Sequence, residues 1–503
     1  MSPESQRSPY YDLYKGKTLL LKVSGRHLEG EKFEAITKAI RKFVSEGIRV
    51  VMVYGGGMQI DREWAKKHKA PRPKRDGVGL TTEEVLRDAV LPAYEYLRQR
   101  IAKRFSDMNP HIVEPANIAA RNNPVGGNQE IFRGHLFCVF GVTTVFRHEG
   151  KPLTIIPFLG KEQDVTRDWP PFVNLNADDI VRNVVQNTNA IDEVMMVTET
   201  GGVLNKKGKV VPLLSKATID EIIAGRHPDI EVKDGMLEKL REVREMLGRV
   251  AKVSLTDDPQ KEIENWRGRG TLCINEDKLE FEPASEQDVA IFRQAHEDLA
   301  KEGKFRQRTE TELTEAALHH FCLKIDGAPL AGLSLIPRGG EWRELACLWS
   351  SYPKNGIASR ILQEALEEAK GHKIYALTSE ENAKRLFEKM QFVSHGRLKP
   401  LQERPSFPLP KTLRDYDTAA RNPYVLSSGL RKTMPSRADA KRISDFLREA
   451  DAVEDGDGAF YGSRPNPQAG VLAKYALARH GRRIDEWKPV AVRYGLPYSV
   501  DLG

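Results

Sequence analysis

The sequence predicts an α/β protein whose first part contains a parallel sheet and whose second part follows a different order of strands and helices. Residues 16–57 alternate between a strand, a helix and a second strand that runs into glycines, as in a βαβ unit. From Leu279 the pattern changes to a strand, two helices and a hairpin. The length of 503 residues exceeds what one core usually supports and suggests about three domains of roughly 150 residues each.

The first region is predicted from a series of apolar runs. GKTLLLKV predicts a strand, EKFEAITKAIRKFVSEG carries apolar residues at helical spacing, and IRVVMVYGGG predicts a second buried strand. Further elements are predicted in the apolar run PLTIIPFL, the helix DDIVRNVVQNT, the strand DEVMMV with a glycine turn and hairpin after it, a helix at 236–247 and the strand VAKVSL. Because parallel strands end at the same edge, ligand sites are expected at their carboxyl ends.

The second region starts with the strand KLEFEPA and a helix whose first turn, at Ser285 and Asp288, resembles a capping box. A second helix is predicted at 310–319, and Asp326 with Gly327 is a favoured pair for a type I′ hairpin turn. There follow the strand WRELACLWSS, the helix ASRILQEALEEAKG, the strand KIYALTS, the helix ENAKRLFEKMQF and a last strand in NPYVLSSGL. Residues 432–503 carry two helical patterns, around 436–449 and 468–480, but no chemical motif.

Composition narrows the class of protein. A hydrophobic fraction of 40% and a charged fraction of 30% indicate an ordinary folded protein, and the net charge of +7 is too modest to favour a nucleic-acid partner. The cysteines lie far apart, which argues against a zinc site or a disulfide framework: Cys138, Cys273, Cys322 and Cys347. The sequence shows neither a signal peptide nor an apolar run of about 18 residues that would span a membrane. We therefore expect a cytoplasmic enzyme without a metal.

The segment YPKNGIASRIL predicts a turn that opens into a helix. Gly356 and Ala358 keep the backbone bare at the helix start, where unpaired N–H groups and partial positive charge favour a phosphate. The preceding strand offers a partner to an extended, amide-bearing cofactor arm, which could add to the sheet edge as a strand does. This combination predicts a pyrophosphate site.

The order of these elements resembles that of the GNAT acetyltransferase superfamily. Its cofactor loop reads Q/R-x-x-G-x-G/A, and here Pro353 stands in the Q/R position with Lys354 as a replacement donor. Residues 382–392 resemble its N-x-x-x-x-L-Y-E-K-x-G-F, with Phe387 in place of the tyrosine often assigned as general acid and Gln391 in place of a glycine. The resemblance implies a GNAT-type α+β fold and acetyl-CoA as cofactor. It places the thioester arm and the pyrophosphate on two groups of residues: Cys347, Leu348 and Trp349, and Lys354, Asn355, Gly356, Ile357 and Ala358.

Acetyl transfer to an amine needs a base for the ammonium proton and donors that polarise the thioester. Glu344, at the entry of the strand ELACLW, is the candidate base, and its alternative reading is a surface carboxylate on a strand. Arg308 is a candidate ligand for a substrate carboxylate, with a solvated cation at a helix start as the alternative.

A phosphorylating site is also suggested by the first region. Such a site needs cations, glycine amides near the phosphates and a carboxylate that orients the cations. The chain offers these groups at strand ends and helix starts: Lys22, Gly25, Gly55, Gly56, Asn174, Asp178 and Lys239. A lysine after an apolar strand is usually a solvated end, but the neighbourhood of Lys22 is rich in glycine.

These stretches resemble the amino-acid kinase family, which shows K-x-G-G, H-G-G-G-P-x-I, N-V-N-A-D and G-G-M-x-x-K where this chain reads KVSG, YGGGMQI, NLNAD and DGMLEK. The resemblance implies a three-layer αβα domain with Lys22 and Lys239 on the phosphates and Asp178 orienting them. It also implies backbone donors at Gly25 and Gly56, and Asn174 on an acetylated substrate. The chain departs from the family at Gly79, where the family has an arginine for the substrate carboxylate.

An amino-acid kinase domain followed by a GNAT domain is the arrangement of the N-acetylglutamate synthase family, and the chain resembles it over about residues 8–431. We expect a kinase-like domain at 1–265, a GNAT domain at 279–431 and a C-terminal extension at 432–503. ELACL resembles the synthase strand that carries the proposed base, which supports Glu344. TLRDYDTAARNPYVLSSGL resembles the closing segment of the synthases, which makes Arg421 a second candidate carboxylate ligand.

The resemblance implies transfer of acetyl from acetyl-CoA to L-glutamate, the entry to arginine synthesis, in a homo-oligomer. The kinase-like domain would then be a regulatory site for arginine, or an active kinase that uses ATP and Mg²⁺ on N-acetylglutamate. Two alternatives remain. The chain could be a kinase-type enzyme whose GNAT domain only binds a ligand, or an acetyltransferase for a different amine.

Overall fold

The structure is a computed structural model, and it describes residues 8–75, 78–122, 133–139, 151–162, 172–338, 342–397 and 424–428. The two helices predicted around 436–449 and 468–480 lie outside these residues, as does Arg421.

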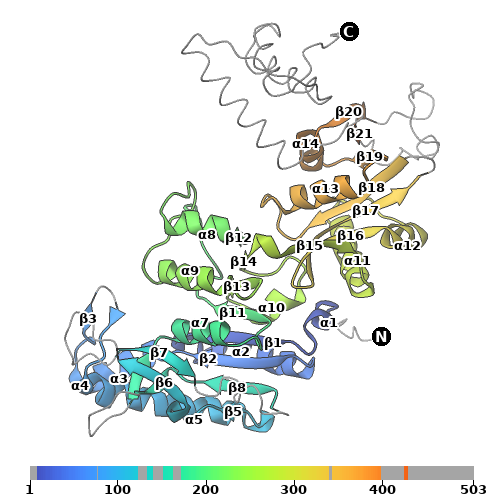
Figure 1. Cartoon of the computed structure of the whole chain (residues 1–503). Helices are drawn as coiled ribbons and strands as arrows, with labels where there is room; N and C mark the ends of the chain where they lie inside the picture. Colours follow the sequence, from blue (N-terminus) through green and yellow to red (C-terminus); the bar gives the residue numbers. More distant parts are fainter. Residues whose placement is uncertain are drawn as a thin grey trace, which may run out of the picture.

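The first part of the chain forms an eight-stranded sheet in the order β12-β14-β13-β11-β1-β2-β8-β5 (Figure 1). Neighbours from β13 to β5 run parallel, β14 runs antiparallel to β13, and β12 runs parallel to β14. The parallel βαβ order predicted from the sequence is confirmed. The strands are β1 (Thr18–Val23), β2 (Arg49–Tyr54), β5 (His111–Ile112), β8 (Leu153–Ile156), β11 (Glu193–Val197), β12 (Leu213–Ser215), β13 (Lys252–Thr256) and β14 (Thr271–Ile274).

Helices cover both faces of this sheet and make a three-layer αβα domain. Side chains of β1 alternate between the two cores: Leu19 and Leu21 pack into one cluster and Leu20 into the other. The first cluster includes residues of α2 (Gly30–Ser45), α3 (Gly57–His68), α4 (Glu83–Val85) and α5 (Leu91–Arg104), and the second includes residues of α7 (Ala177–Asn187), α8 (Lys216–Ile223) and α9 (Asp234–Met246). Every residue of β1 is buried, because the sheet is covered on both sides.

Two features of this domain were not predicted. Four strands close on one another beside the main sheet: β6 (Ile118–Asn122), β7 (Arg133–Val139), β9 (Leu159–Glu162) and β10 (Phe172–Leu175). A short ribbon pairs β3 (Lys74–Arg75) with β4 (Val78–Gly79). The hairpin predicted after β11 is reduced to a single bridge between Leu204 and Val210, since the glycines and lysines of this turn leave little apolar surface to hold two strands.

The second part of the chain forms a seven-stranded sheet in the order β15-β16-β17-β18-β19-β21-β20 (Figure 1). Its pairs are antiparallel except for β18 and β19, which run parallel. The strands are β15 (Leu279–Pro283), β16 (His320–Ile325), β17 (Ala328–Pro337), β18 (Trp342–Ser350), β19 (Lys373–Thr378), β20 (Phe392–Arg397) and β21 (Tyr424–Ser428). Strand β20 was not predicted, whereas the type I′ turn is supported by positive φ angles at Asp326 and Gly327.

Four helices cover the two faces of the second sheet. One face carries α13 (Ile357–Glu368) and α14 (Glu381–Lys389), and the other carries α11 (Glu286–Lys301) and α12 (Glu310–Leu318) (Figure 1). The capping box predicted at the start of α11 is present between Ser285 and Asp288. Together with the first domain, this arrangement confirms the predicted fold class.

The two sheets are joined by apolar packing. Leu272 and Ile274 on β14 of the first sheet share a core cluster with Leu323 and Leu330 of the second. A short N-terminal helix, α1 (Tyr10–Tyr14), and α10 (Pro259–Glu264) lie at the junction. The rings of Trp266 and Trp349 meet edge to face across it, with centroids 5.7 Å apart. Of the helices in the described part of the chain, none is both long and apolar enough to cross a membrane.

Candidate active site

Strands β18 and β19 separate in the middle of the second sheet. Their parallel pairing ends at Leu345 and Ala376, although β18 continues to Ser350. Just beyond this point β18 bulges, because Ala346 pairs with Ser334 and Trp349 with Gly332, so that two residues oppose a single one. Backbone groups of β18 beyond Leu345 therefore face an opening between the strands, where the sequence places the cofactor arm.

The three strand residues predicted for that arm form the bulge. Cys347 has a φ of 54°, which a non-glycine residue rarely adopts. Burial raises the pKa of its thiol to about 11, so the side chain stays protonated near neutral pH. Trp349 Nε1–H donates to His320 Nε2 at 3.3 Å, and Ser334 Oγ lies 2.9 Å from His320 Nδ1. His320, which sequence analysis missed, thus fixes the indole that ends the bulge.

The predicted pyrophosphate loop precedes α13. Gly356 caps the helix with a φ of 81°, Lys354 has a φ of 68°, and no side chain caps the helix start. Asn355 Nδ2 donates to the carbonyl of Pro353 at 3.1 Å. Ile357 is buried and anchors the helix start, while Ala358 is half-buried. The first N–H groups of α13 are therefore suited to an anion.

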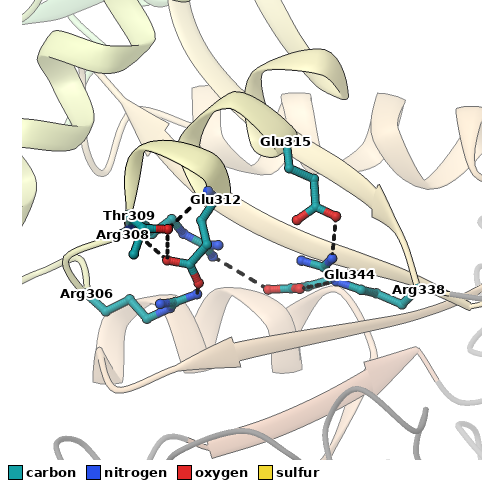
Figure 2. Close-up of polar contacts among 7 residues, drawn as sticks. All are labelled: Arg306, Arg308, Thr309, Glu312, Glu315, Arg338 and Glu344. Atoms are coloured by element: carbon teal, nitrogen blue, oxygen red, sulfur yellow. Dashed lines mark hydrogen bonds and ion pairs between the residues drawn. The ribbon is translucent and has the colours of Figure 1, made fainter.

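Glu344 lies on β18 within the stretch that still pairs with β19, and it is buried with 7% exposure. Its Oε2 accepts a hydrogen bond of 2.8 Å from Arg338 Nε, and its Oε1 lies 3.6 Å from Arg308 Nη2 (Figure 2). Arg338 Nη1 also donates to Glu315 Oε1 at 2.7 Å. The reading of Glu344 as a surface carboxylate is thereby excluded.

Arg308 is also buried, with 8% side-chain exposure, so it is not a solvated cation. The neighbouring carboxylate of Glu312 is bound elsewhere: Arg306 donates to it, and its Oε2 accepts the Thr309 amide at 2.8 Å (Figure 2). Although burial acts in the opposite direction, these donors lower the pKa of Glu312 to about 2. Glu312 is thus committed to Arg306 and Thr309, and Arg308 contacts Glu344 only at the looser distance of 3.6 Å.

Arg338 was missed by sequence analysis. It follows β17, and the register pairs Ile336 with Glu344, so the hairpin brings its side chain back to the carboxylate. Burial disfavours its charge, but Glu344 and Glu315 outweigh burial and raise the pKa of Arg338 above its ordinary value. Arg338 therefore stays charged beside Glu344.

Phe387, at the position of the tyrosine in the resemblance, is buried and packs against Phe392 with ring centroids 5.1 Å apart. It has no titratable group and belongs to the core. Gln391 has a φ of 64°, a left-handed conformation that favours glycine.

A second site lies in the first domain. A cavity of about 650 Å³ lies at the carboxyl ends of β1, β2 and β11, and all seven residues predicted for the kinase-like site line it: Lys22, Gly25, Gly55, Gly56, Asn174, Asp178 and Lys239. The parallel sheet brings Lys22 and the glycines to the carboxyl ends of β1 and β2, and Asp178 lies in the first turn of α7. Asn174 comes from β10 of the four closed strands, and Lys239 comes from the second turn of α9.

The charges in this cavity are centred on Asp178. Its Oδ1 lies 2.8 Å from Lys22 Nζ, and its Oδ2 lies 3.1 Å from Lys239 Nζ. Burial alone would raise the pKa of Asp178, but the two lysines hold it well below its usual range. Burial lowers the pKa of Lys239 to about 8, and the charge of Lys22 contributes, while Asp178 acts in the opposite direction.

Packing explains two of the three predicted glycines of the cavity but not the third. A Cβ at Gly25 would lie 2.4 Å from Gln59 Oε1, and one at Gly56 would lie 2.4 Å from the ring of Phe158. Both positions therefore require glycine for packing. A Cβ at Gly55 would make only ordinary contacts, at 3.5 Å from Ala177, so packing does not explain this glycine.

Comparisons with known proteins match the two parts of the chain to two different families. Residues 17–257 match the amino acid kinase family, and residues 284–392 match the acetyltransferase (GNAT) family. The chain thus joins an amino-acid-kinase-type domain to a GNAT-type acetyltransferase domain. This arrangement is that of an N-acetylglutamate-synthase-like fusion.

An amino-acid acetyltransferase of Shewanella oneidensis is 24% identical over 392 residues, which cover 74% of this chain and 87% of that protein. An acetylglutamate kinase of Bordetella petrii is 27% identical over 250 residues, covering 47% of this chain and 79% of that protein. The crystal structure of N-acetylglutamate synthase from Neisseria gonorrhoeae, complexed with coenzyme A and L-arginine, superposes with a TM-score of 0.54 at 19% identity. The superposition covers 84% of this chain and 97% of the synthase chain, and it shows that the two proteins share a fold.

Proposed function

We propose that the second domain transfers the acetyl group of acetyl-CoA to the amino group of L-glutamate, forming N-acetylglutamate. The observation that carries this proposal is the buried Glu344 carboxylate, which lies between Arg338 and Arg308 beside the opening between β18 and β19. The names of the amino-acid acetyltransferase relatives and of the N-acetylglutamate synthase structure support the choice of substrate.

Acetyl-CoA supplies an acetyl group that is activated as a thioester. The bulge residues Cys347 and Trp349 fit its amide-bearing arm, because β18 has no ladder partner toward β19 at this point among the described residues. The uncapped start of α13 at Gly356 fits its pyrophosphate. Lys354, half a turn before the helix, is exposed and provides a further cation.

Glu344 is the general base. Arg338 holds one of its oxygens at 2.8 Å, which fixes the direction of the carboxylate. The other oxygen has only the looser contact with Arg308 at 3.6 Å, and it is the oxygen that accepts the proton of the substrate ammonium, directly or through a water molecule. Arg308 turns from this contact to a carboxylate of the substrate, a match that suits its planar guanidinium. We propose Arg421 as the second carboxylate ligand.

The test is an acceptor screen with labelled acetyl-CoA against all common amino acids, with and without arginine. L-glutamate should be the main acceptor, and product with another amine alone would overturn the substrate assignment. Glu344→Gln should lower kcat by about 10²–10⁴-fold, the usual range for this role. Glu315→Gln is the matched control. Glu315 also accepts a hydrogen bond from Arg338, but it lies on α12 and is not the proposed base. Near-normal rates in Glu344→Gln would contradict its role as base.

The first domain has a second candidate function, phosphorylation of N-acetylglutamate by ATP with Mg²⁺. The specific observation in its favour is the pair of lysines held on one buried carboxylate in a glycine-lined cavity. Lys22 and Lys239 would neutralise the phosphates. Asp178, which contacts both ammonium groups, would orient them. ATP turnover that depends on N-acetylglutamate and is lost in Lys239→Ala would establish this reaction. No turnover in the parent protein would leave the domain a regulatory one, with arginine as its proposed effector.

We also propose that the chain forms a homo-oligomer and acts in the cytoplasm. The division at 1–265, 279–431 and 432–503 stays a prediction, and β14 shows that the first sheet extends to Ile274. Light scattering of the purified full chain measures the oligomeric state, and a monomer at micromolar concentration would contradict this part.

A further inference from the structure

Arg72 is a buried cation in the wall of the first-domain cavity. It follows α3 and lines the cavity together with Lys22 and Asp178, and its side chain is only 8% exposed. Its Nε lies 2.9 Å from Asp61 Oδ1, within the distance of an ion pair. The contact of Nε with Asp61 lacks hydrogen-bond geometry, and Nη1 is buried without a hydrogen-bond acceptor among the described residues. The guanidinium is therefore built into the cavity with donors left over.

A buried guanidinium N–H without an acceptor is energetically unfavourable. A buried polar group without a partner destabilises the folded protein, and it does so more strongly when it is charged. Burial also lowers the pKa of Arg72, while Asp61 only partly offsets this effect. Asp61 itself is 46% exposed and so gives weak compensation. These observations indicate that an anion normally completes the environment of Arg72.

The cavity is shaped around the guanidinium. A Cβ at Gly79 would lie 1.9 Å from Arg72 Nη2 and 2.3 Å from its Cζ, so any other residue at this position would displace the group. The wall that carries Gly79 is tied to the opposite strand, because Asn174 Nδ2 donates to Thr81 Oγ1 at 3.1 Å. Gly79 thus makes the room in which Arg72 lies.

The chemistry of the other groups defines the class of ligand. Lys22, Lys239 and Arg72 outnumber the carboxylates of Asp178 and Asp61, so this part of the cavity favours an anion. The two lysines share Asp178 and are compact charges, whereas Arg72 presents a planar fork, the shape that recognises a carboxylate. The volume of about 650 Å³ is that of a small-molecule site.

We propose that Arg72 is the specificity-determining residue of this cavity and binds the α-carboxylate of an amino acid or of an N-acylated amino acid. Gly79 gives Arg72 the room to do so. This inference does not rest on acetyl transfer in the second domain, nor on whether the first domain has catalytic activity, because it concerns binding alone.

Calorimetric titration of the full chain tests it. The probes are N-acetyl-L-glutamate and L-arginine, each compared with the analogue in which a carboxamide replaces the α-carboxylate. At least one acid should bind, and its amide should bind about tenfold more weakly or worse. The acid that binds distinguishes a substrate-like ligand from an effector-like one. Failure of both acids to bind would overturn the proposal.

Variants separate Arg72 from the rest of the chain. Arg72→Met should lose about tenfold or more in affinity for the acid but not for its amide, and Arg72→Lys should recover part of the loss. Gly79→Ala should weaken binding while retaining Arg72. Arg26→Met is the matched control, because Arg26 lines the same cavity with a 64% exposed side chain paired to Glu199, and it should bind normally.

Arg308→Met separates the two domains. Binding that survives in Arg72→Met but is lost in Arg308→Met would belong to the second domain and would overturn the proposal. Thermal melting of each variant checks that it is folded, and Gly79→Ala and Arg72→Lys decide the question if Arg72→Met is not.

Discussion

At the scale of single residues, both sites are buried clusters in which arginine or lysine faces a carboxylate. In the second domain Glu344 has two arginine neighbours at unequal distances, 2.8 Å to Arg338 and 3.6 Å to Arg308. The inequality gives the two cations different roles. We propose that the closer one orients the base and that the looser one exchanges its partner for a substrate.

We propose on this basis that Arg338 is a positioning residue, and its removal should affect turnover more than binding. We expect Arg338→Met to lower kcat by about tenfold or more with an almost unchanged KM for acetyl-CoA, because Glu344 loses the hydrogen bond that directs it. Arg338→Lys should restore part of kcat. Arg343→Met, on the exposed side of β18 next to His372, is the control. A higher KM for acetyl-CoA with a normal kcat would show that Arg338 serves only to hold the fold.

The pKa of Lys239 gives the first-domain cavity a dependence on pH. Its value of about 8, against 10.5 for an ordinary lysine, means that Lys239 is charged below pH 8 and neutral above it. Affinity for ATP should therefore fall as pH rises through about 8. Calorimetry from about pH 6.5 to about pH 9.5, roughly 1.5 units on either side of this pKa, measures how the affinity for ATP changes with pH.

Lys239→Arg serves as the comparison, because its charge persists over this range, and its ATP affinity should vary less with pH. An equal slope in the parent and in Lys239→Arg would assign the effect to another group.

Residues at the ends of strands could be predicted from sequence, and residues whose partners depend on register could not. Lys22 and Asp178 share one cavity because a parallel sheet collects strand ends and helix starts at one edge, and Lys239 reaches the same cavity from the second turn of α9. Arg338 and His320 gave no signal, since their partners on β18 are chosen by the pairing of β17 with β18 and with β16.

At the scale of elements, the bulge in β18 is the feature on which the proposed binding of the cofactor arm depends. The sequence WRELACLWSS predicted the strand, but not the extra residue, because a bulge leaves no signature in an apolar run. At the bulge, the rings of His320 and Trp349 lie close to the backbone of Gly332 on the neighbouring strand. A Cβ at Gly332, opposite the bulge, would lie 2.3 Å from His320 Nε2 and 2.5 Å from Trp349 Nε1.

Gly332→Ala should consequently disturb the bulge. Because both neighbours are rings held by a hydrogen bond, we expect a loss of about 1–3 kcal/mol in the free energy of unfolding, as in overpacked cores. The affinity for acetyl-CoA should fall as Trp349 moves. Denaturant unfolding and calorimetry measure the two effects. Gly57→Ala, where a Cβ would meet nothing within 4 Å, should change neither, and an equally silent Gly332→Ala would contradict the role given to the bulge.

At the scale of the whole molecule, the two sheets share a core. Leu272 belongs to β14 of the first sheet, yet it packs in a cluster with Leu330 and Leu345 of the second. The sequence predicted a change of pattern at Leu279 and hence the start of a second domain there. It could not predict their contact, because packing between distant segments has no local periodicity.

This shared core should couple the unfolding of the two domains. Leu272→Ala removes a side chain that is 5% exposed and should cost about 2–5 kcal/mol. In differential scanning calorimetry the transitions of both domains should move to lower temperature together. Leu318→Ala, on α12 with 77% exposure, should leave the scan unchanged. A shift confined to one transition would mean that the domains unfold independently.

The edge-to-face pair of Trp266 and Trp349 has a consequence for observation as well as for packing. Two indoles this close exchange electronic excitation, so the pair should give the near-ultraviolet circular dichroism a signal that Trp64 and Trp342, the other tryptophans of the described residues, do not share. One ring ends the first region and the other lies in the bulge of β18. The chain therefore contains an unlabelled optical reporter, able to follow in real time whether a ligand in either domain changes the junction between them.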